Sequence, residues 1–269
     1  MSFTDNVELT DKAELTAKAA ELLQLHTAPD ILTLINVWDV ISARVIAGLD
    51  RTHALATASH SIAAAHGYPD GEQIPVDEMI AAVGKIAAAT ELPVTADLEA
   101  GYGNSGETIR KGIGVGIVGA NLEDQMKPLT EAVDAVAAAV AAADAEGVSF
   151  VLNARTDAFL RAGDRPLADV TGEAIDRGRA FLDAGAACFF VPGLLDEETV
   201  RSLVDGLGPQ KISLIAVPGS LTVAQMASLG VARVSVGPWS QRIALTALAD
   251  AAADILAGGS VPRETRQLN

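Results

Sequence analysis

The stretch that decides the fold reads Pro93-Val-Thr-Ala-Asp-Leu-Glu-Ala-Gly-Tyr-Gly103, a short apolar run that ends in two acids. A second run, Ala120-Asn-Leu-Glu-Asp124, ends in the same way, and the residues between the two runs have the composition of a helix. Two strands joined through a helix form the repeating unit of a parallel sheet. We therefore expect the acids to lie at one end of such a sheet, where the strands stop.

The alternation of short apolar runs with helical segments recurs about eight times, which predicts a parallel (β/α)8 barrel of the TIM type. A length of 269 residues suits one such barrel, so we expect residues 1–269 to form a single domain. An N-terminal helix from Asp11 to about Leu25 precedes the first run. The apolar runs are Ile31 to Ile35, Ala54 to Ala58, Pro93 to Leu98, Ala120 to Leu122, Val148 to Ala154, Ala187 to Val191, Ile212 to Val217 and Val231 to Val236.

The formal net charge of −16 disfavours polyanionic partners, so we expect neither nucleic acid nor an anionic membrane surface to bind. Cys188 is the one cysteine, which excludes an intrachain disulfide and a multi-cysteine zinc site. The sequence does not begin with a basic segment followed by a long apolar run, and no apolar stretch reaches the ~20 residues that cross a bilayer. These observations predict a cytoplasmic protein.

Polar side chains follow each of the first five apolar runs, and in a barrel such positions converge on the rim at the carboxyl ends of the strands. Carboxylates after two successive strands, beside an arginine after the next, form a plausible metal and anion site. The residues in question are Asn36, Trp38, Asp39, Ser59, His60, Asp97, Glu99, Glu123, Asp124, Arg155 and Asp157.

The acids have the chemistry that Mg²⁺ prefers. Asp97 and Glu99 are two residues apart, a spacing that puts both side chains on one face of a strand, and Glu123 comes from the neighbouring strand. Mg²⁺ takes oxygen ligands and usually keeps several waters, so one direct carboxylate with two outer acids is reasonable. The alternative interpretation is a rim of solvated acids that binds nothing.

The segment Gly114-Val-Gly-Ile-Val-Gly119 has the letters of a dinucleotide-binding loop. Such a loop follows a strand and opens a helix, whereas this segment ends a predicted helix and enters a strand. Helix packing and a tight turn explain the glycines more economically.

Several motifs follow one another along nearly the whole chain. They are Asn36-Val-Trp-Asp-Val-Ile-Ser-Ala-Arg44, Ala56-Thr-Ala-Ser59, Gly67-Tyr-Pro-Asp-Gly71, Asp97 to Gly103, Asn121-Leu-Glu-Asp124 and Asn153-Ala-Arg-Thr-Asp157. In these motifs, and in their order and spacing, the chain resembles the isocitrate lyase/phosphoenolpyruvate mutase superfamily.

The resemblance implies a role for each matching residue. Asp97 would bind Mg²⁺, or Mn²⁺, while Glu99 and Glu123 would act mainly through metal-bound water. Arg155 would be a catalytic residue and a cationic contact to the substrate, and Asp70 would lie near the site with a catalytic role. The implied substrate contacts are Trp38, Asp39, Thr57, Ala58 and Ser59, with a substrate carboxylate received by the last three.

The chain departs from the family where the isocitrate and methylisocitrate lyases carry a cysteine-bearing loop. Gln125-Met-Lys-Pro-Leu129 stands in that place, without a cysteine or a histidine. The loop also lacks the longer lysine- and asparagine-bearing gate of a phosphoenolpyruvate mutase. Lys127 and His60 are open candidates for a role in the site, and Cys188 is expected to be a buried packing residue.

These features together predict a Mg²⁺-dependent lyase that cleaves a carbon–carbon bond of a small 2-oxo acid through a metal-stabilised enolate, as in oxaloacetate decarboxylation. A phosphoenolpyruvate/phosphonopyruvate mutase or a phosphonate hydrolase is the alternative enzyme, and a non-catalytic 2-oxo acid binding protein is the alternative outside enzymes. The helix expected at Gln241 to Ala257 offers apolar residues for packing on, or exchange with, a partner subunit, so we expect a homodimer or homotetramer.

Overall fold

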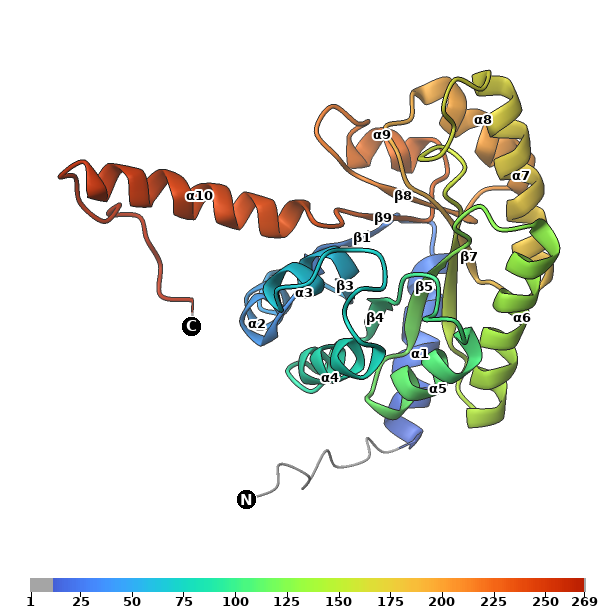
Figure 1. Cartoon of the computed structure of the whole chain (residues 1–269), viewed down its shortest axis with the longest axis horizontal. Coiled ribbons are helices and arrows are strands. Elements are labelled where there is room, and N and C mark those ends of the chain that lie inside the picture. The colour runs from blue at the N-terminus through green and yellow to red at the C-terminus, as the bar shows by residue number, and fades with distance from the viewer. Residues whose placement is uncertain (1–11, 269) are drawn as a thin grey trace.

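The computed structural model describes residues 12–268, whose strands all join one sheet with every pair parallel (Figure 1). The strand order is β1-β9-β8-β7-β6-β5-β4-β3-β2, and the two ends of the sheet are consecutive in the chain, so the sheet curls into a nearly closed barrel. The strands are β1 (Leu32–Leu34), β2 (Asn36–Val37), β3 (Leu55–Thr57), β4 (Val94–Asp97), β5 (Gly119–Glu123), β6 (Val151–Arg155), β7 (Cys188–Val191), β8 (Ile212–Ile215) and β9 (Arg233–Ser235).

The sequence prediction of a TIM-type barrel is confirmed, with one refinement at the first strand. The run Ile31 to Ile35 becomes β1, which pairs with β9, and the chain then continues as β2, which pairs with β3. β1 and β2 together occupy the place of the first barrel strand, and the other seven apolar runs each supply one strand.

The helices between the strands cover the outside of the barrel. Several of them begin directly after a proline, which is favoured at the start of a helix because it has no backbone N–H to leave unpaired there. Pro75, Pro128 and Pro166 precede α4, α6 and α7 in this way, and Gly147 ends α6 in the left-handed conformation. The helices are α1 (Lys12–Thr27), α2 (Val40–Ala47), α3 (Ser59–Ala65), α4 (Val76–Ala87), α5 (Ser105–Gly114), α6 (Leu129–Glu146), α7 (Leu167–Asp183), α8 (Glu197–Leu207), α9 (Val223–Ser228) and α10 (Trp239–Leu256).

The expected N-terminal helix is present as α1, although Asp11, where it was predicted to begin, lies outside the described residues. Its buried face packs Leu22 against the start of β5, where a Cβ on Gly119 would approach Leu22 Cδ2 to 2.8 Å. Only glycine permits that approach, so α1 can cover the amino ends of the strands. The opposite rim, at the carboxyl ends, is left for the loops.

Gly114 ends α5 and Gly119 opens β5, which confirms that this segment enters a strand instead of following one. The glycines of a dinucleotide-binding loop would need the reverse order. Gly116 has a φ of 99° in the turn between the two elements, a conformation that glycine adopts without strain.

The last helix, α10, extends away from the barrel (Figure 1). Gln241 is its buried residue, whereas Ile243, Leu248 and Leu256 are 68%, 64% and 88% exposed. Within residues 12–268 no helix is both long enough and apolar enough to cross a membrane.

Candidate active site

Asp97 is the last residue of β4 and is fixed by the chain that follows β3. The Ser59 hydroxyl donates to Asp97 Oδ2 at 2.8 Å, and the Ser59 backbone N–H donates to the same oxygen at 3.3 Å. The Asp97 backbone N–H donates to Thr57 Oγ1 at 3.1 Å. The predicted metal ligand and two of the predicted carboxylate-binding residues therefore form one hydrogen-bonded unit, in which Ala58 is the buried residue between the two.

Glu99 reaches the site by a different route from the one its spacing predicted. β4 ends at Asp97, and Glu99 lies in the following turn with a φ of 53°, so alternation along a strand does not orient its side chain. The buried carboxylate is held instead by the loop that contains Glu72 and by a tyrosine three residues further along its own segment. The Glu72 N–H donates to Glu99 Oε2 at 2.6 Å, and the Tyr102 hydroxyl donates to Oε1 at 3.4 Å.

Glu123 and Arg155 end adjacent strands and are paired in register. An ion pair joins Arg155 Nη1 to Glu123 Oε2 at 2.8 Å, and a second joins Arg155 Nη2 to Asp157 Oδ1 at 2.8 Å. The Glu123 backbone N–H also donates to the Glu99 carbonyl at 2.8 Å, which links the two predicted outer acids. Three neighbouring strands thus bring acids and one arginine to the same rim.

Burial and neighbouring negative charges raise the pKa of two of the acids. Burial raises the pKa of Glu99 to about 7, and the charges of Asp97, Asp70 and Glu72 add to the effect. Burial likewise raises the pKa of Glu123 to about 7 against the opposing charge of Arg155. Burial and the nearby carboxylates raise the pKa of Tyr102, so its phenol stays protonated at neutral pH.

This donor set fits a hard divalent cation, because the side chains are carboxylates whose mutual repulsion a cation would relieve. Within residues 12–268 no three or more His, Cys, Asp or Glu side chains are grouped closely enough to hold a metal ion together. A cation bound here would therefore have fewer than three of these side chains as direct ligands, and Asp97, Glu99 and Glu123 are the carboxylates that would hold it, directly or through bound water.

The connection from β5 to α6 is short, and contacts of Asp124 with residues that follow β6 and with α7 hold it in place. Asp124 accepts from the Met126 N–H at 2.9 Å and from the Thr156 hydroxyl at 2.8 Å, and it pairs with Arg177 Nη1 at 3.2 Å. Arg177 also donates to the Lys127 carbonyl at 3.1 Å, while the Lys127 side chain is exposed. The segment that carries a cysteine in the lyases is here a compact turn without a thiol.

Other predicted residues lie around this centre. Asp70 is exposed but near enough for its charge to act on Glu99. Asp39 caps α2, where its Oδ1 accepts from the Ser42 N–H at 2.7 Å, and Trp38 lines a groove of about 280 Å³ with Asp39 and residues of α2 and α4. No hydrogen bond or ion pair among the described residues joins Trp38 or Asp39 to Asp97.

His60 follows Ser59 in α3, and its buried Nδ1 has no hydrogen-bond partner.

Sequence reasoning missed residues that contact the predicted site residues and hold them in place. Glu72 is the clearest example, because its carboxylate accepts from the Tyr102 N–H at 2.6 Å while its own N–H binds Glu99. Its backbone φ of 59° follows the Gly71 turn, and that turn was the available signal that the loop folds back. Arg177 was also missed, because it lies on a helix and only the folded structure pairs it with Asp124. Asp157 was among the residues expected at the rim, and the structure pairs it with Arg155.

Cys188 begins β7 and is completely buried, where its thiol donates to the Lys211 carbonyl at 3.3 Å. Burial raises the pKa of Cys188 to about 12. The prediction that this thiol is a packing residue is consistent with its place inside the barrel wall.

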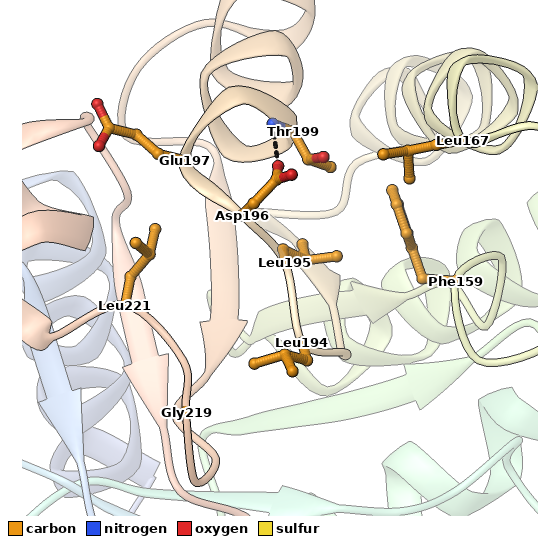
Figure 2. A pocket seen from close by; sticks show the side chains of 9 residues that line it. All are labelled: Phe159, Leu167, Leu194, Leu195, Asp196, Glu197, Thr199, Gly219 and Leu221. Atoms are coloured by element: carbon orange, nitrogen blue, oxygen red, sulfur yellow. Dashed lines mark hydrogen bonds between the residues drawn. The ribbon is translucent and has the colours of Figure 1, made fainter.

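A separate pocket of about 470 Å³ opens among the loops that follow β6, β7 and β8 (Figure 2). Its lining is mostly apolar, and in Figure 2 the Asp196 carboxylate is hydrogen-bonded to the Thr199 N–H, a capping contact at the start of α8. The lining residues are Phe159, Leu167, Leu194, Leu195, Asp196, Glu197, Thr199, Gly219 and Leu221. None of the acids that follow β4 and β5 lines this pocket.

Comparison with known proteins settles the family. Residues 22–256 match the family described as phosphoenolpyruvate phosphomutase. The chain belongs to the isocitrate lyase/phosphoenolpyruvate mutase superfamily. Members of this superfamily are lyases or mutases and typically depend on a divalent metal.

Three relatives illustrate the range of this superfamily. An uncharacterized protein of Mycobacterium tuberculosis is 31% identical over 89% of this chain and 90% of its own length. An oxaloacetate decarboxylase of Paraburkholderia xenovorans is 26% identical over 87% of this chain and 81% of its own. A crystal structure of a Burkholderia cenocepacia J2315 protein, provisionally named a phosphonomutase, is 39% identical, has a TM-score of 0.83, and aligns with 91% of this chain and 100% of that one.

Proposed function

We propose that this superfamily member is a Mg²⁺-dependent lyase that cleaves a carbon–carbon bond of a small 2-oxo acid, with oxaloacetate as the first substrate to test. The observation that carries the proposal is the meeting of Asp97, Glu99, Glu123 and Arg155 at the ends of three neighbouring strands. A relative named oxaloacetate decarboxylase supports the choice of substrate.

The residues divide the work between the metal and the substrate. Asp97, with Ser59 on its Oδ2 oxygen, would hold the cation, and Mn²⁺ could replace Mg²⁺ there. When bound, the cation supplies Lewis-acid stabilisation of the negative charge that develops on the 2-oxo group. Arg155 carries the positive charge that meets the substrate carboxylate, and the negative charges of Glu123, Asp97 and Asp157 raise the pKa of its guanidinium against the effect of burial.

Decarboxylation suits a site without a thiol acid. When oxaloacetate loses CO₂, the electrons of the broken bond stay on the three-carbon fragment as an enolate, and one proton from solvent then gives pyruvate. The departure of CO₂ needs no protein base. The turn at Gln125 to Pro128 has no cysteine and Cys188 is buried, so neither offers a thiol acid at the rim, which favours this reaction over the cleavage of isocitrate.

Carbon–phosphorus chemistry is the second candidate, because the matching family and the Burkholderia cenocepacia relative carry phosphomutase names. A non-catalytic 2-oxo acid binding protein is the third interpretation. The experiment that separates the three is incubation with oxaloacetate, phosphonopyruvate and methylisocitrate, each with and without Mg²⁺, followed by ¹H and ³¹P NMR. Pyruvate formed from oxaloacetate faster than in the same solution without protein supports the lyase, a new phosphorus signal supports the mutase or hydrolase, and no turnover above the protein-free solution supports the binding protein.

We also infer that the protein is a homodimer or homotetramer assembled through α10. Leu245, Leu248 and Ile255 recur at spacings of three and seven residues, so they form one stripe along a helix that has little contact with its own barrel. A second copy of this chain is the occupant that would cover the stripe. The cytoplasmic location expected from the sequence stays a prediction.

A further inference from the structure

Arg233 is a charged residue in the interior of the barrel. It opens β9, its side chain is 1% exposed, and its guanidinium makes no ion pair among the described residues. Its Nη2 donates to Asn121 Oδ1 at 3.2 Å, and its Nε has no hydrogen-bond partner. Arg177, the other deeply buried arginine, contrasts with it because Arg177 contacts both Asp124 and Glu173. The charge of Arg233 is therefore not neutralised by any side chain that touches it.

The surroundings of Arg233 form a polar layer across the inside of the barrel. Asn153 Nδ2 donates to Asn121 Oδ1 at 2.9 Å and to Ser213 Oγ at 3.3 Å. Layers at this depth in a TIM barrel are usually filled by bulky apolar side chains. This layer instead contains two amides, a hydroxyl and a guanidinium, and packing of the barrel interior alone does not require these polar groups.

His26, from α1, lies next to Arg233 and adds no charge to the layer. Its Nδ1 lies 2.8 Å from the Leu22 carbonyl, which can only accept, so Nδ1 carries the proton. Nε2 is then unprotonated, and its lone pair faces Arg233 Nη1 at a distance of 3.5 Å. Burial and the charge of Arg233 lower the pKa of His26 to about 3, so the histidine is neutral and the layer carries one net positive charge.

This positive charge is linked to the predicted metal site through Asn121. Asn121, which holds the guanidinium, is register-paired with Asp97 on one side and with Asn153 on the other. Burial lowers the pKa of Arg233 to about 10, while Cys188 and then the negative charge of Asp97 act in the opposite direction. Charges that interact through a protein interior are screened less than charges in water.

We propose that Arg233 is a positioning residue whose buried charge sets the balance between cation and anion binding at the rim. The charge offsets part of the negative field of Asp97, Glu99 and Glu123, so it weakens the binding of the divalent metal and strengthens the binding of the anionic substrate. The inference rests on the metal site of the proposed function. It predicts that removal of the charge changes the two affinities in opposite directions, a result that a purely structural arginine would not give.

Two variants remove the charge by different routes. Arg233→Met deletes the guanidinium. Asn121→Asp keeps the acceptor oxygen for Arg233 and Asn153 but neutralises the arginine in place, so it tests the idea if Arg233→Met does not fold. Arg233→Lys restores the charge, and Arg179→Met removes an exposed positive charge from α7 as a matched control.

The measurements are calorimetric titrations of each folded protein with Mn²⁺, and then with oxalate at saturating Mn²⁺. We expect Mn²⁺ to bind about threefold or more tightly to Arg233→Met and Asn121→Asp, and oxalate to bind about threefold or more weakly. Arg233→Lys and Arg179→Met should match the wild type in both titrations.

Other outcomes overturn the inference. Unchanged affinities in folded Asn121→Asp, or a loss of both affinities, would mean that Arg233 serves the fold alone. If the wild-type protein itself binds no Mn²⁺, the metal site of the proposed function is wrong and the inference falls with it. A failure of the inference alone is recognised by normal Mn²⁺ binding in the wild type.

Discussion

The Ser59 hydroxyl and the Asp97 carboxylate are joined at 2.8 Å, and the backbone N–H of Ser59 reaches the same oxygen. The segment proposed to receive a substrate carboxylate is therefore in direct contact with the side chain proposed to hold the metal. Binding of either ligand would act on the other through this contact, because Ser59 touches the carboxylate that would hold the cation. The contact also fixes the Oδ2 oxygen of that carboxylate.

Ser59→Ala should weaken Mg²⁺ binding without abolishing it. The substitution removes a hydrogen bond to a charged acceptor, for which a cost of about 1.5 kcal/mol or more is usual, but the backbone N–H contact remains. We expect the affinity for Mg²⁺, measured by calorimetry, to fall by about tenfold, whereas Asp97→Ala should abolish binding in a protein that still folds. Unchanged affinity in Asp97→Ala would remove Asp97 from the role of metal ligand.

Arg155→Ala should impair substrate use much more than Cys188→Ala. Loss of the arginine removes the charge that meets the substrate anion, so we expect kcat/KM to fall by the equivalent of roughly 2 kcal/mol or more. Arg161→Ala is the matched control, because Arg161 is exposed and lies 3.7 Å from the same Asp157. Steady-state kinetics on oxaloacetate gives the comparison.

Cys188→Ala should retain most of the activity and lose ~1 kcal/mol or more of stability, since the small buried side chain is well packed. If Cys188→Ala were folded but inactive while Arg155→Ala remained active, the anion site and the cysteine-independent mechanism would both be wrong.

His26 should make the folded protein sensitive to acid. Its pKa is lowered from the ordinary 6.5 to about 3 by burial and by Arg233, so the folded state favours the neutral ring. The contribution of the neutral His26 ring to the free energy of unfolding is fully present above pH 6.5. It is lost as the pH falls towards 3, at up to about 1.4 kcal/mol per pH unit. Urea unfolding between pH 7 and 4 should give the wild type a steeper loss of stability than His26→Gln. Parallel profiles would contradict this account of His26.

Leu248→Glu should convert the assembled protein to a monomer. The substitution puts a charge into the exposed stripe of α10, where a partner subunit is proposed to pack. Thr246→Glu adds the same charge on the opposite side of the helix, because successive residues are about 100° apart, and it should leave assembly intact. Sedimentation equilibrium at micromolar concentration provides the test. A monomeric wild-type protein would refute the proposed assembly.

The barrel could be predicted from the sequence because each strand is a short apolar run with a helical segment before the next. The same regularity placed Asp97, Glu123 and Arg155 at the ends of β4, β5 and β6, since each is the last residue of its strand. Positions of this kind follow from local pattern and from the shared direction of parallel strands.

The turns around the site could not be predicted in this way. Glu99 and Glu72 both have a positive φ, so their side chains are oriented by loop conformation and not by a strand period. Asp39 is different, because an acid three residues before Ser42 at the start of a helical segment is a capping pattern that the sequence already contained. Arg233 occurs within an apolar run, and only its contacts inside the barrel distinguish it from an outward-facing arginine.

The most direct test of the central claim is the rate at which the wild-type protein converts oxaloacetate to pyruvate and CO₂ at a fixed Mg²⁺ concentration. Dissolved Mg²⁺ also promotes this reaction slowly, so folded Asp97→Ala at the same Mg²⁺ concentration is the reference. A carbon–carbon lyase of the proposed kind should give a wild-type rate far above that reference, and removal of the metal with a chelator should abolish the difference. Equal rates for the two proteins, or a wild-type rate that survives the chelator, would contradict the proposal.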